Sequence, residues 1–244
     1  TSPSAPQPTA QAECSQPPAA RTFPVHHHPT SSAPDPQLRL ETLLVRSGTG
    51  TDPATGAITT PIHLSTAYGH PGLGESTGYD YTRTASPTRD VLQDALARLE
   101  GGTAAFALSS GMAALELVTR TLAPHGSRIV ALRDLYGGSF RFLEVLAEEG
   151  AADVDFVLGL EGLRGALADP ADLVIIETPT NPMMEEISIP EAAELAHAAG
   201  AKLVVDNTFY TRWCSGPWSW GPTSSSTPVR STWAGTTTSW RVWP

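Results

Sequence analysis

Short runs of continuous apolar residues, separated by segments with helical periodicity, most constrain what this chain can fold into. The clearest runs cover residues 103–108, 128–133, 153–158, 171–178 and 202–207. Strands that are apolar on both faces are typical of a parallel sheet covered by helices. Helical patterns at 139–150 and 189–200 lie between these runs. The sequence therefore predicts an α/β fold with a mainly parallel sheet wrapped by helices.

Two further helices are marked by their ends. Ser86 is a good N-cap residue and Pro87 suits the first helical position, which predicts a helix that ends before Gly101 and Gly102. The segment "SSGMAALELVTRTL" predicts a turn at Ser109 and Ser110 that leads directly into another helix.

Composition excludes several classes of protein. The net charge of −10 does not favour nucleic-acid binding, and no apolar run is long enough to span a bilayer. Two distant cysteines, Cys14 and Cys214, cannot form a disulfide framework or a cysteine-based metal site. The first residues lack the layout of a signal peptide, so we expect a cytoplasmic protein.

The chain divides into three parts. Residues 1–36 are rich in Pro, Ser and Ala, which predicts a disordered tail; a wrongly chosen start site would also explain it. Its histidines, His26, His27 and His28, are expected to be incidental, and we predict no metal site. Residues 37–211 form an N-terminal segment and a partial ligand-binding domain. Residues 212–244 differ sharply: they contain all six tryptophans and no Leu, Ile, Asp or Glu.

Polar residues follow the predicted strands, where ligands bind in α/β sheets. Ser110, Gly111 and Met112 form a turn at a helix N-terminus, which is suited to an anion or to no ligand at all. Asp206 is a carboxylate at the end of a buried run, so it needs a partner. Other candidates are the aromatic and basic residues Tyr81, Arg83 and Tyr136, the loop amide of Asn181, and Glu177 and Thr208, for which packing roles are equally acceptable.

The motifs "YDYTRTASPTR", "SSGMAA", "DLYGG", "ETPTNP" and "VVDNTF", in this order, resemble the fold-type-I enzymes of cysteine and methionine metabolism that depend on pyridoxal 5′-phosphate (PLP). The resemblance runs from about Glu41 to Thr211. It looks closest to the bacterial branch of cystathionine γ-synthase and O-acetylhomoserine thiol-lyase. It implies a large PLP-binding domain, which here is incomplete at the C-terminus.

The resemblance also implies residue roles. The backbone of Ser110, Gly111 and Met112 would hold the phosphate, and Tyr136 would stack on the ring and assist proton movement. Asp206 would keep the pyridine nitrogen protonated. The remaining implied contacts are Asn181 to the ring hydroxyl, Thr208 to the ring face, and Tyr81 and Arg83 to the phosphate of a neighbouring subunit in a dimer or tetramer.

The implied activity is γ-replacement on an O-acylated homoserine by cysteine or another thiol. Cystathionine γ- or β-lyase and O-acetylhomoserine sulfhydrylase activities are alternatives, and the substrate amino acid stays open. A non-catalytic remnant and a simple binding module are the alternatives from other classes.

The family's Schiff-base lysine is expected 25 positions after Asp206, at Ser231, but Lys202 is the only lysine of the chain. Codons for residues 218–221, read one base out of frame, give Glu-Leu-Gly, and a lysine codon can straddle Arg230 and Ser231. We therefore expect that the reading frame slipped near Thr211. The chain as printed is then expected to be inactive, poorly soluble and without fixed structure beyond Arg212.

Overall fold

The computed structural model describes residues 38–49, 52, 54–100 and 102–210, and the backbone of 230–234 and 238–243. The expectations for residues 1–36, including Cys14 and the three histidines, and for Cys214, lie outside the described residues. Within the described part, no helix has the length and apolar character needed to cross a membrane.

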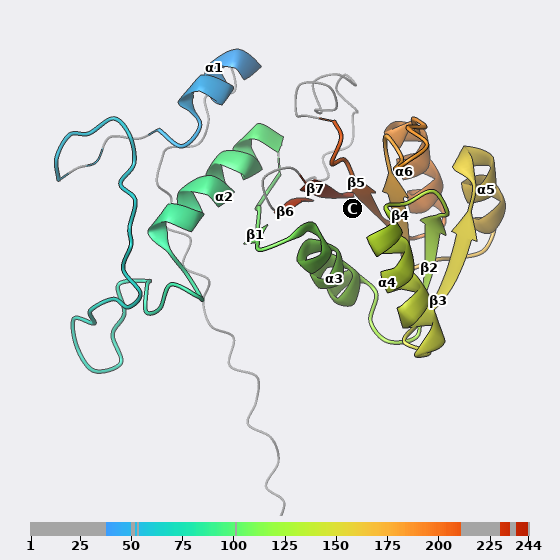
Figure 1. The fold of residues 1–244 in the computed structure, drawn as a ribbon, viewed down its shortest axis with the longest axis horizontal. Helices are drawn as coiled ribbons and strands as arrows, with labels where there is room; N and C mark the ends of the chain where they lie inside the picture. Colours follow the sequence, from blue (N-terminus) through green and yellow to red (C-terminus); the bar gives the residue numbers. More distant parts are fainter. Residues whose placement is uncertain are drawn as a thin grey trace, which may run out of the picture.

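The centre of the molecule is a seven-stranded sheet in the order β1-β6-β7-β5-β4-β2-β3 (Figure 1). Its strands are β1 (Ala107–Leu108), β2 (Ser127–Leu132), β3 (Ala152–Val157), β4 (Leu173–Glu177), β5 (Lys202–Asp206), β6 (Arg230–Ala234) and β7 (Thr238–Trp243). Strands β2 to β5 pair in parallel with one another, and β7 runs antiparallel to both of its neighbours. The predicted α/β fold with a mainly parallel sheet is confirmed.

The apolar runs form the core as their composition predicts. Every residue of β4 is buried, and Ile129, Val130, Leu203 and Val204 are fully enclosed. Burying such side chains stabilises a fold by about 1.5–3 kcal/mol each. The central strands β2, β4 and β5 therefore carry much of the stability of the domain.

Helices cover both faces of this sheet. They are α3 (Gly111–Leu122), α4 (Gly137–Glu148), α5 (Gly159–Ala166) and α6 (Ile189–Ala198). Connections leaving β1 and β2 run in one direction across the sheet, and those leaving β3 and β4 run in the other. Because such crossovers are right-handed, α3 and α4 lie on one face and α5 and α6 on the opposite face.

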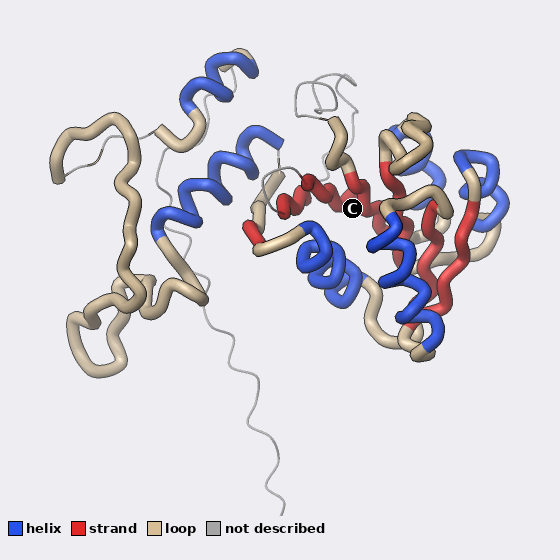
Figure 2. Tube along the Cα trace, viewed as in Figure 1, coloured by secondary structure: helices blue, strands red, loops and turns tan. Residues whose placement is uncertain are grey.

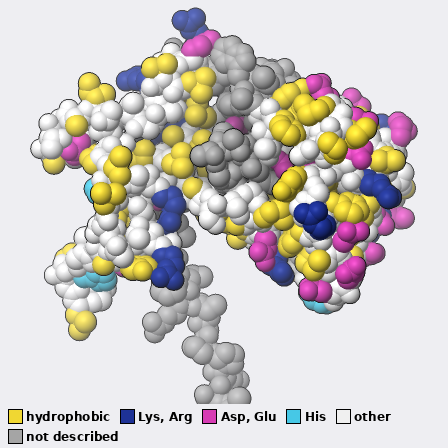
Figure 3. Space-filling model, in the orientation of Figure 1, with side chains coloured by type: hydrophobic (Ala, Val, Ile, Leu, Met, Phe, Trp, Pro, Cys, Tyr) yellow, Lys and Arg dark blue, Asp and Glu magenta, His cyan; other side chains and the backbone are white. Residues whose placement is uncertain are grey.

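Two helices precede the sheet. They are α1 (Leu40–Arg46) and α2 (Pro87–Glu100), and α2 has the bounds that its cap residues predict. Figure 2 shows that the described residues between these helices form a long loop, which we call the N-terminal arm (47–86). The arm lies on the far side of α2 from the sheet. It exposes large apolar side chains at Ile58, Ile62, Leu64 and Leu73, and yellow side chains are visible over this part of Figure 3.

The expectation of no fixed structure beyond Arg212 is wrong for two stretches. Strands β6 and β7 form an antiparallel hairpin there, and this hairpin fills the space between β1 and β5. Ladder hydrogen bonds join backbone groups, so a segment without a continuous apolar run can still complete a sheet. The rest of residues 211–244 lies outside the described part. The origin of this segment in a shifted reading frame stays a prediction.

Candidate functional site

The carboxyl ends of the parallel strands bring most of the predicted site residues to one edge of the sheet. The turn after β1 leads into α3, the turn after β2 into α4, and the loop after β4 into α6. Asp206 is the last residue of β5. Open α/β sheets bind their ligands at this edge, at the point where the connections between strands change direction. In this sheet the change falls between β2 and β4, because the chain passes outward from β2 to β3 and then back from β4 to β5.

The N-terminus of α3 has the geometry of an anion cradle. Ser110 is the N-cap, and its Oγ accepts a hydrogen bond from the N–H of Ala113 at 3.1 Å. Gly111 and Met112 are the first helical residues, whose N–H groups have no partner within the helix. These two donors and the helix dipole therefore remain directed at the space in front of the turn.

Tyr136 lies beside this cradle, at the N-terminus of α4. A Cβ atom placed on Gly138 would lie 2.5 Å from Cε1 of Tyr136 and 3.0 Å from Sδ of Met112. The tyrosine ring and the methionine therefore meet over Gly138, and no larger residue can occupy this position without displacing them. The ring stays about half exposed, so one side of it is open to a ligand.

Asp206 is the buried charge of the site. It is 4% exposed, and its Oδ1 accepts hydrogen bonds from both the N–H and the hydroxyl of Thr208. Burial raises the pKa of Asp206 to about 6, and the bonds from Thr208 act in the opposite direction. A cation opposite this carboxylate would favour its ionised form. Thr208 therefore orients Asp206, a contact that its implied role against a ring did not include.

Glu177, for which the sequence left a packing role open, has a specific contact. Its Oε2 accepts a hydrogen bond from the N–H of Tyr136 at 2.6 Å, and Glu177 is the register partner of Asp206. Burial raises the pKa of Glu177 to about 8, and the neighbouring Asp206 contributes in the same direction. Glu177 thus links the strand that precedes Asn181 to the aromatic residue of the site.

The loop after β4 is held by its own backbone and by Asn207. The Nδ2 of Asn207, a residue that the sequence analysis did not single out, donates to the carbonyl of Thr178 at 2.7 Å. Thr180 and Glu185 exchange backbone hydrogen bonds across the loop. Asn181 lies half-buried within it. A buried amide directly after a strand-end carboxylate is the signal that could have identified Asn207.

Tyr81 and Arg83 lie together but apart from the cradle. The guanidinium of Arg83 donates to the Tyr81 hydroxyl at 3.2 Å and lies 5.3 Å from the centre of its ring. Both residues belong to the N-terminal arm, which Figure 1 shows separated from the sheet edge by α2. The structure therefore brings them together with each other and not with Ser110, Gly111 and Met112.

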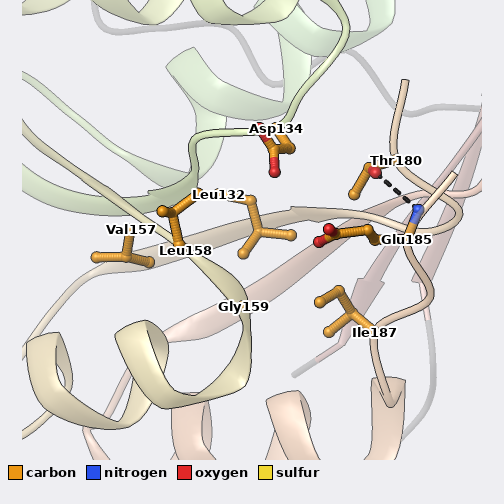
Figure 4. Close-up of a pocket in the computed structure, with 8 residues that line it drawn as sticks. All are labelled: Leu132, Asp134, Val157, Leu158, Gly159, Thr180, Glu185 and Ile187. Carbon is orange, nitrogen blue, oxygen red and sulfur yellow. Dashed lines mark hydrogen bonds between the residues drawn. The ribbon is translucent and has the colours of Figure 1, made fainter. Parts of the chain in front are cut away.

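A small hollow lies near this edge, between the ends of β2 and β3 and the loop after β4 (Figure 4). Asp134 and Glu185 face it from opposite sides, and Leu132, Val157 and Ile187 supply apolar walls. Within the described residues, no group of three or more His, Cys, Asp or Glu side chains is arranged to hold a metal ion.

Comparison with known proteins agrees with this geometry. The model of the Cys/Met metabolism PLP-dependent enzyme family matches residues 41–222. The chain belongs to this family, whose solved members show that its sheet has the PLP fold type I. Its cofactor is therefore PLP.

Several relatives of this chain are cystathionine gamma-synthases. Cystathionine gamma-synthase of Haemophilus influenzae is 42% identical over 74% of this chain and 50% of its own length, and that of Escherichia coli is 45% identical over 69% and 44%. The crystal structure of cystathionine gamma synthase from Xanthomonas oryzae pv. oryzae has a TM-score of 0.72 at 34% identity, covering 84% of this chain and 54% of the other. The chain thus spans about half the length of the relatives it matches.

The site residues fit PLP in part. A phosphate would meet the free N–H groups of α3, an aromatic ring would meet Tyr136, and a protonated ring nitrogen would satisfy the buried Asp206. No lysine is placed to bind PLP covalently at this edge. The sequence has one lysine, Lys202. Lys202 is the exposed first residue of β5 and lies at the opposite end of this strand from Asp206.

Proposed function

We propose that this chain derives from an enzyme that replaces the γ-substituent of an O-acylated homoserine with cysteine or another thiol. The observation that carries this proposal is the alignment of the α3 N-terminus, Tyr136 and Asp206 along one sheet edge. The relatives named cystathionine gamma-synthase support this branch of the family. Relatives named cystathionine beta-lyase and cystathionine gamma-lyase match at 36–38% identity, so lyase activity is the alternative.

Each residue has a proposed task at this site. The N–H groups of Gly111 and Met112, with the Ser110 cap, bind and orient the phosphate. The aromatic ring of Tyr136 covers one face of the cofactor, and its hydroxyl moves a proton. Asp206, oriented by Thr208, stabilises positive charge on the ring nitrogen, and the amide of Asn181 bonds the ring hydroxyl. PLP, when bound, supplies an electron sink for the substrate's α-carbon.

The absence of a lysine near Asp206 supports a further proposal, that the chain as printed is a non-catalytic remnant. An amine is needed both to link the cofactor and to transfer protons at the substrate. Arg128, Arg133 and the other arginines cannot replace it, because a guanidinium does not lose its proton in proteins. We therefore propose that this chain holds PLP without a covalent bond.

The paired residues of the N-terminal arm support an oligomeric parent enzyme. Tyr81 and Arg83 lie apart from the cradle of their own chain, so we propose that they serve the phosphate of a neighbouring copy in a dimer or tetramer. The exposed apolar side chains of the arm, such as Ile62 and Leu64, favour such contacts. We further propose that this parent enzyme works in the cytoplasm.

Titration with PLP tests the proposed cofactor site. The full chain should show saturable, weak binding by absorbance, and borohydride treatment followed by mass spectrometry should find no PLP bound covalently. Asp206→Asn should weaken binding about tenfold, since it removes a buried charge opposite the ring nitrogen. Glu185→Ala, which changes an exposed carboxylate on a nearby loop, is the matched control. Equal affinity for all three proteins would contradict the assignment of Asp206.

The proposed frame shift is tested in the gene. Inserting or deleting one base near the Thr211 codon should open a frame that continues past Pro244 and encodes a lysine at position 231. The repaired product should then bind PLP covalently. Stop codons in that frame within a few dozen bases would contradict this explanation of residues 212–244.

A further inference from the structure

Glu177 lies at the meeting point of three elements of the site. It ends β4, it is 3% exposed, and its Oε2 accepts the N–H of Tyr136 at 2.6 Å. Its register partner on the neighbouring parallel strand is Asp206. Side chains at register positions on parallel strands lie on the same side of the sheet, so the two carboxyl groups are neighbours.

The carbonyl of Tyr136 accepts a hydrogen bond from the N–H of Phe140 in its own helix, but its N–H is held from outside the helix, by Glu177. Tyr136 is the N-cap of α4, and it makes no side-chain capping hydrogen bond. Its ring is half exposed and lies over Gly138, beside the side chain of Met112. The hydrogen bond to Glu177 therefore anchors the backbone to β4 at the point where the ring enters the site.

The charge of the pair is distributed unequally. Two adjacent buried carboxylates cannot both ionise without a large electrostatic cost. Both carboxyl groups accept hydrogen bonds that favour the anion: Asp206 accepts two from Thr208, and Glu177 accepts the N–H groups of Tyr136 and Asn181. At Glu177, burial and the charge of Asp206 outweigh these bonds. Arg133 and Asp134 belong to the same turn as Tyr136, but the charge that disfavours ionisation of Glu177 comes from Asp206. The proton of the pair therefore resides on Glu177, whose pKa is about 8 against about 6 for Asp206.

We propose that Glu177 is a positioning residue of the site: as a neutral acid it fixes the backbone of Tyr136 and leaves Asp206 as the single negative charge facing the ligand. The identity of that ligand rests on the function proposed above. The contact between Glu177 and Tyr136 is independent of that function, because it forms without a ligand. A glutamine should therefore substitute for Glu177, and an apolar residue of similar size should not.

Amide hydrogen exchange in the full chain without ligand tests the positioning. In Glu177→Leu the N–H of Tyr136 loses its acceptor and should exchange about tenfold faster than in wild type. Glu177→Gln keeps an acceptor oxygen and should retain slow exchange, and Glu185→Ala is the control. Equal exchange at Tyr136 in wild type and the leucine variant, or fast exchange in the glutamine variant, would overturn the proposal.

The carboxyl carbon resonance of Glu177 tests the neutral state and does not require the leucine variant to fold. With ¹³C-labelled glutamate, the signal that disappears in Glu177→Gln is that of Glu177. It should report a protonated carboxyl at pH 7. A signal that shows an ionised carboxylate at pH 6 would overturn the neutral role.

PLP binding separates this proposal from the proposed function. The glutamine variant should bind PLP within about twofold of wild type, and the leucine variant about tenfold more weakly, since it loses the fixed aromatic ring. If the wild-type chain never saturates with PLP, the cofactor site is refuted. Amide hydrogen exchange and the ¹³C carboxyl resonance then still test the positioning role of Glu177. Equal binding by wild type and a folded leucine variant would refute the role of Glu177 and leave the cofactor site standing.

Discussion

Strands β4 and β7 occupy neighbouring regions of one sheet, but they differ in what makes them strands. Strand β4, with the sequence "LVIIE", is apolar at four successive positions and is buried throughout. Strand β7, with the sequence "TSWRVW", has no continuous apolar run: Trp240 and Val242 alternate with Ser239 and Arg241, and the strand is joined to β5 by backbone pairing. A run of apolar side chains thus specifies its own place in a sheet, whereas an open strand edge accepts an extended segment of almost any composition.

Removing residues 211–244 tests this difference with the largest expected effect. Without β6 and β7, both β1 and β5 lose a hydrogen-bonded neighbour. Domains of this size are stable by only about 5–15 kcal/mol, so we expect the cooperative thermal transition seen by circular dichroism to be lost. A chain that lacks residues 1–36 controls for shortening as such. An unchanged transition in the chain cut at 210 would show that the hairpin adds nothing to the sheet.

A smaller effect is expected at Glu177, the last residue of the apolar strand β4. Its folded pKa of about 8 lies above its ordinary value of 4.5, so the neutral form favours folding. The stability it contributes is complete below pH 4.5 and is lost as the pH rises toward 8. Glu177→Gln should therefore be about 1–3 kcal/mol more stable than wild type at pH 8.5, with little difference at pH 4.5. Urea unfolding at both pH values measures this, and a constant difference would contradict the shift.

The smallest effect is expected at the Ser110 cap. Ser110→Ala removes the acceptor of the Ala113 N–H and should cost about 1 kcal/mol in the free energy of unfolding. The same change at Ser65, whose hydroxyl bonds only the nearby carbonyl of Ala67 in the exposed arm, is the matched control. Equal losses for both variants would show that the cap adds nothing beyond an ordinary surface hydroxyl.

Local patterns predicted the elements whose signals are contained in a few residues. Helix α2 begins at Pro87 and ends at Glu100 as its caps indicate, and β5 matches its apolar run to within one residue. The run at 103–108 predicts a longer strand than the structure has, since only Ala107 and Leu108 pair, with Trp233 and Ala234 at the end of β6. Helices α1 and α5 were not anticipated; α5, for example, has three glycines among its eight residues.

In the candidate site, too, short sequence patterns predict some features, whereas others depend on contacts between residues far apart in the sequence. Strand-end position alone selects Asp206, Tyr136 and the turn at Ser110 as candidates, and the structure places them at one edge of the sheet. The link between Glu177 and Tyr136 joins residues 41 positions apart, and the bond between Asn207 and Thr178 joins residues 29 apart. Such contacts follow from the order of strands in the sheet, which no short sequence pattern contains. The hairpin was missed for the same reason, because its place is defined by the gap between β1 and β5.

The hairpin follows β5 along the chain, and this order has a consequence for synthesis. Strand β5 ends at Asp206, and its partner β7 is complete only at Trp243. At about 5–20 residues per second, the ribosome leaves this valine-rich edge open for roughly 2–7 seconds. During that interval the nascent chain presents a template for pairing with other chains, so chaperone supply at this stage of translation should govern how much of the protein escapes aggregation.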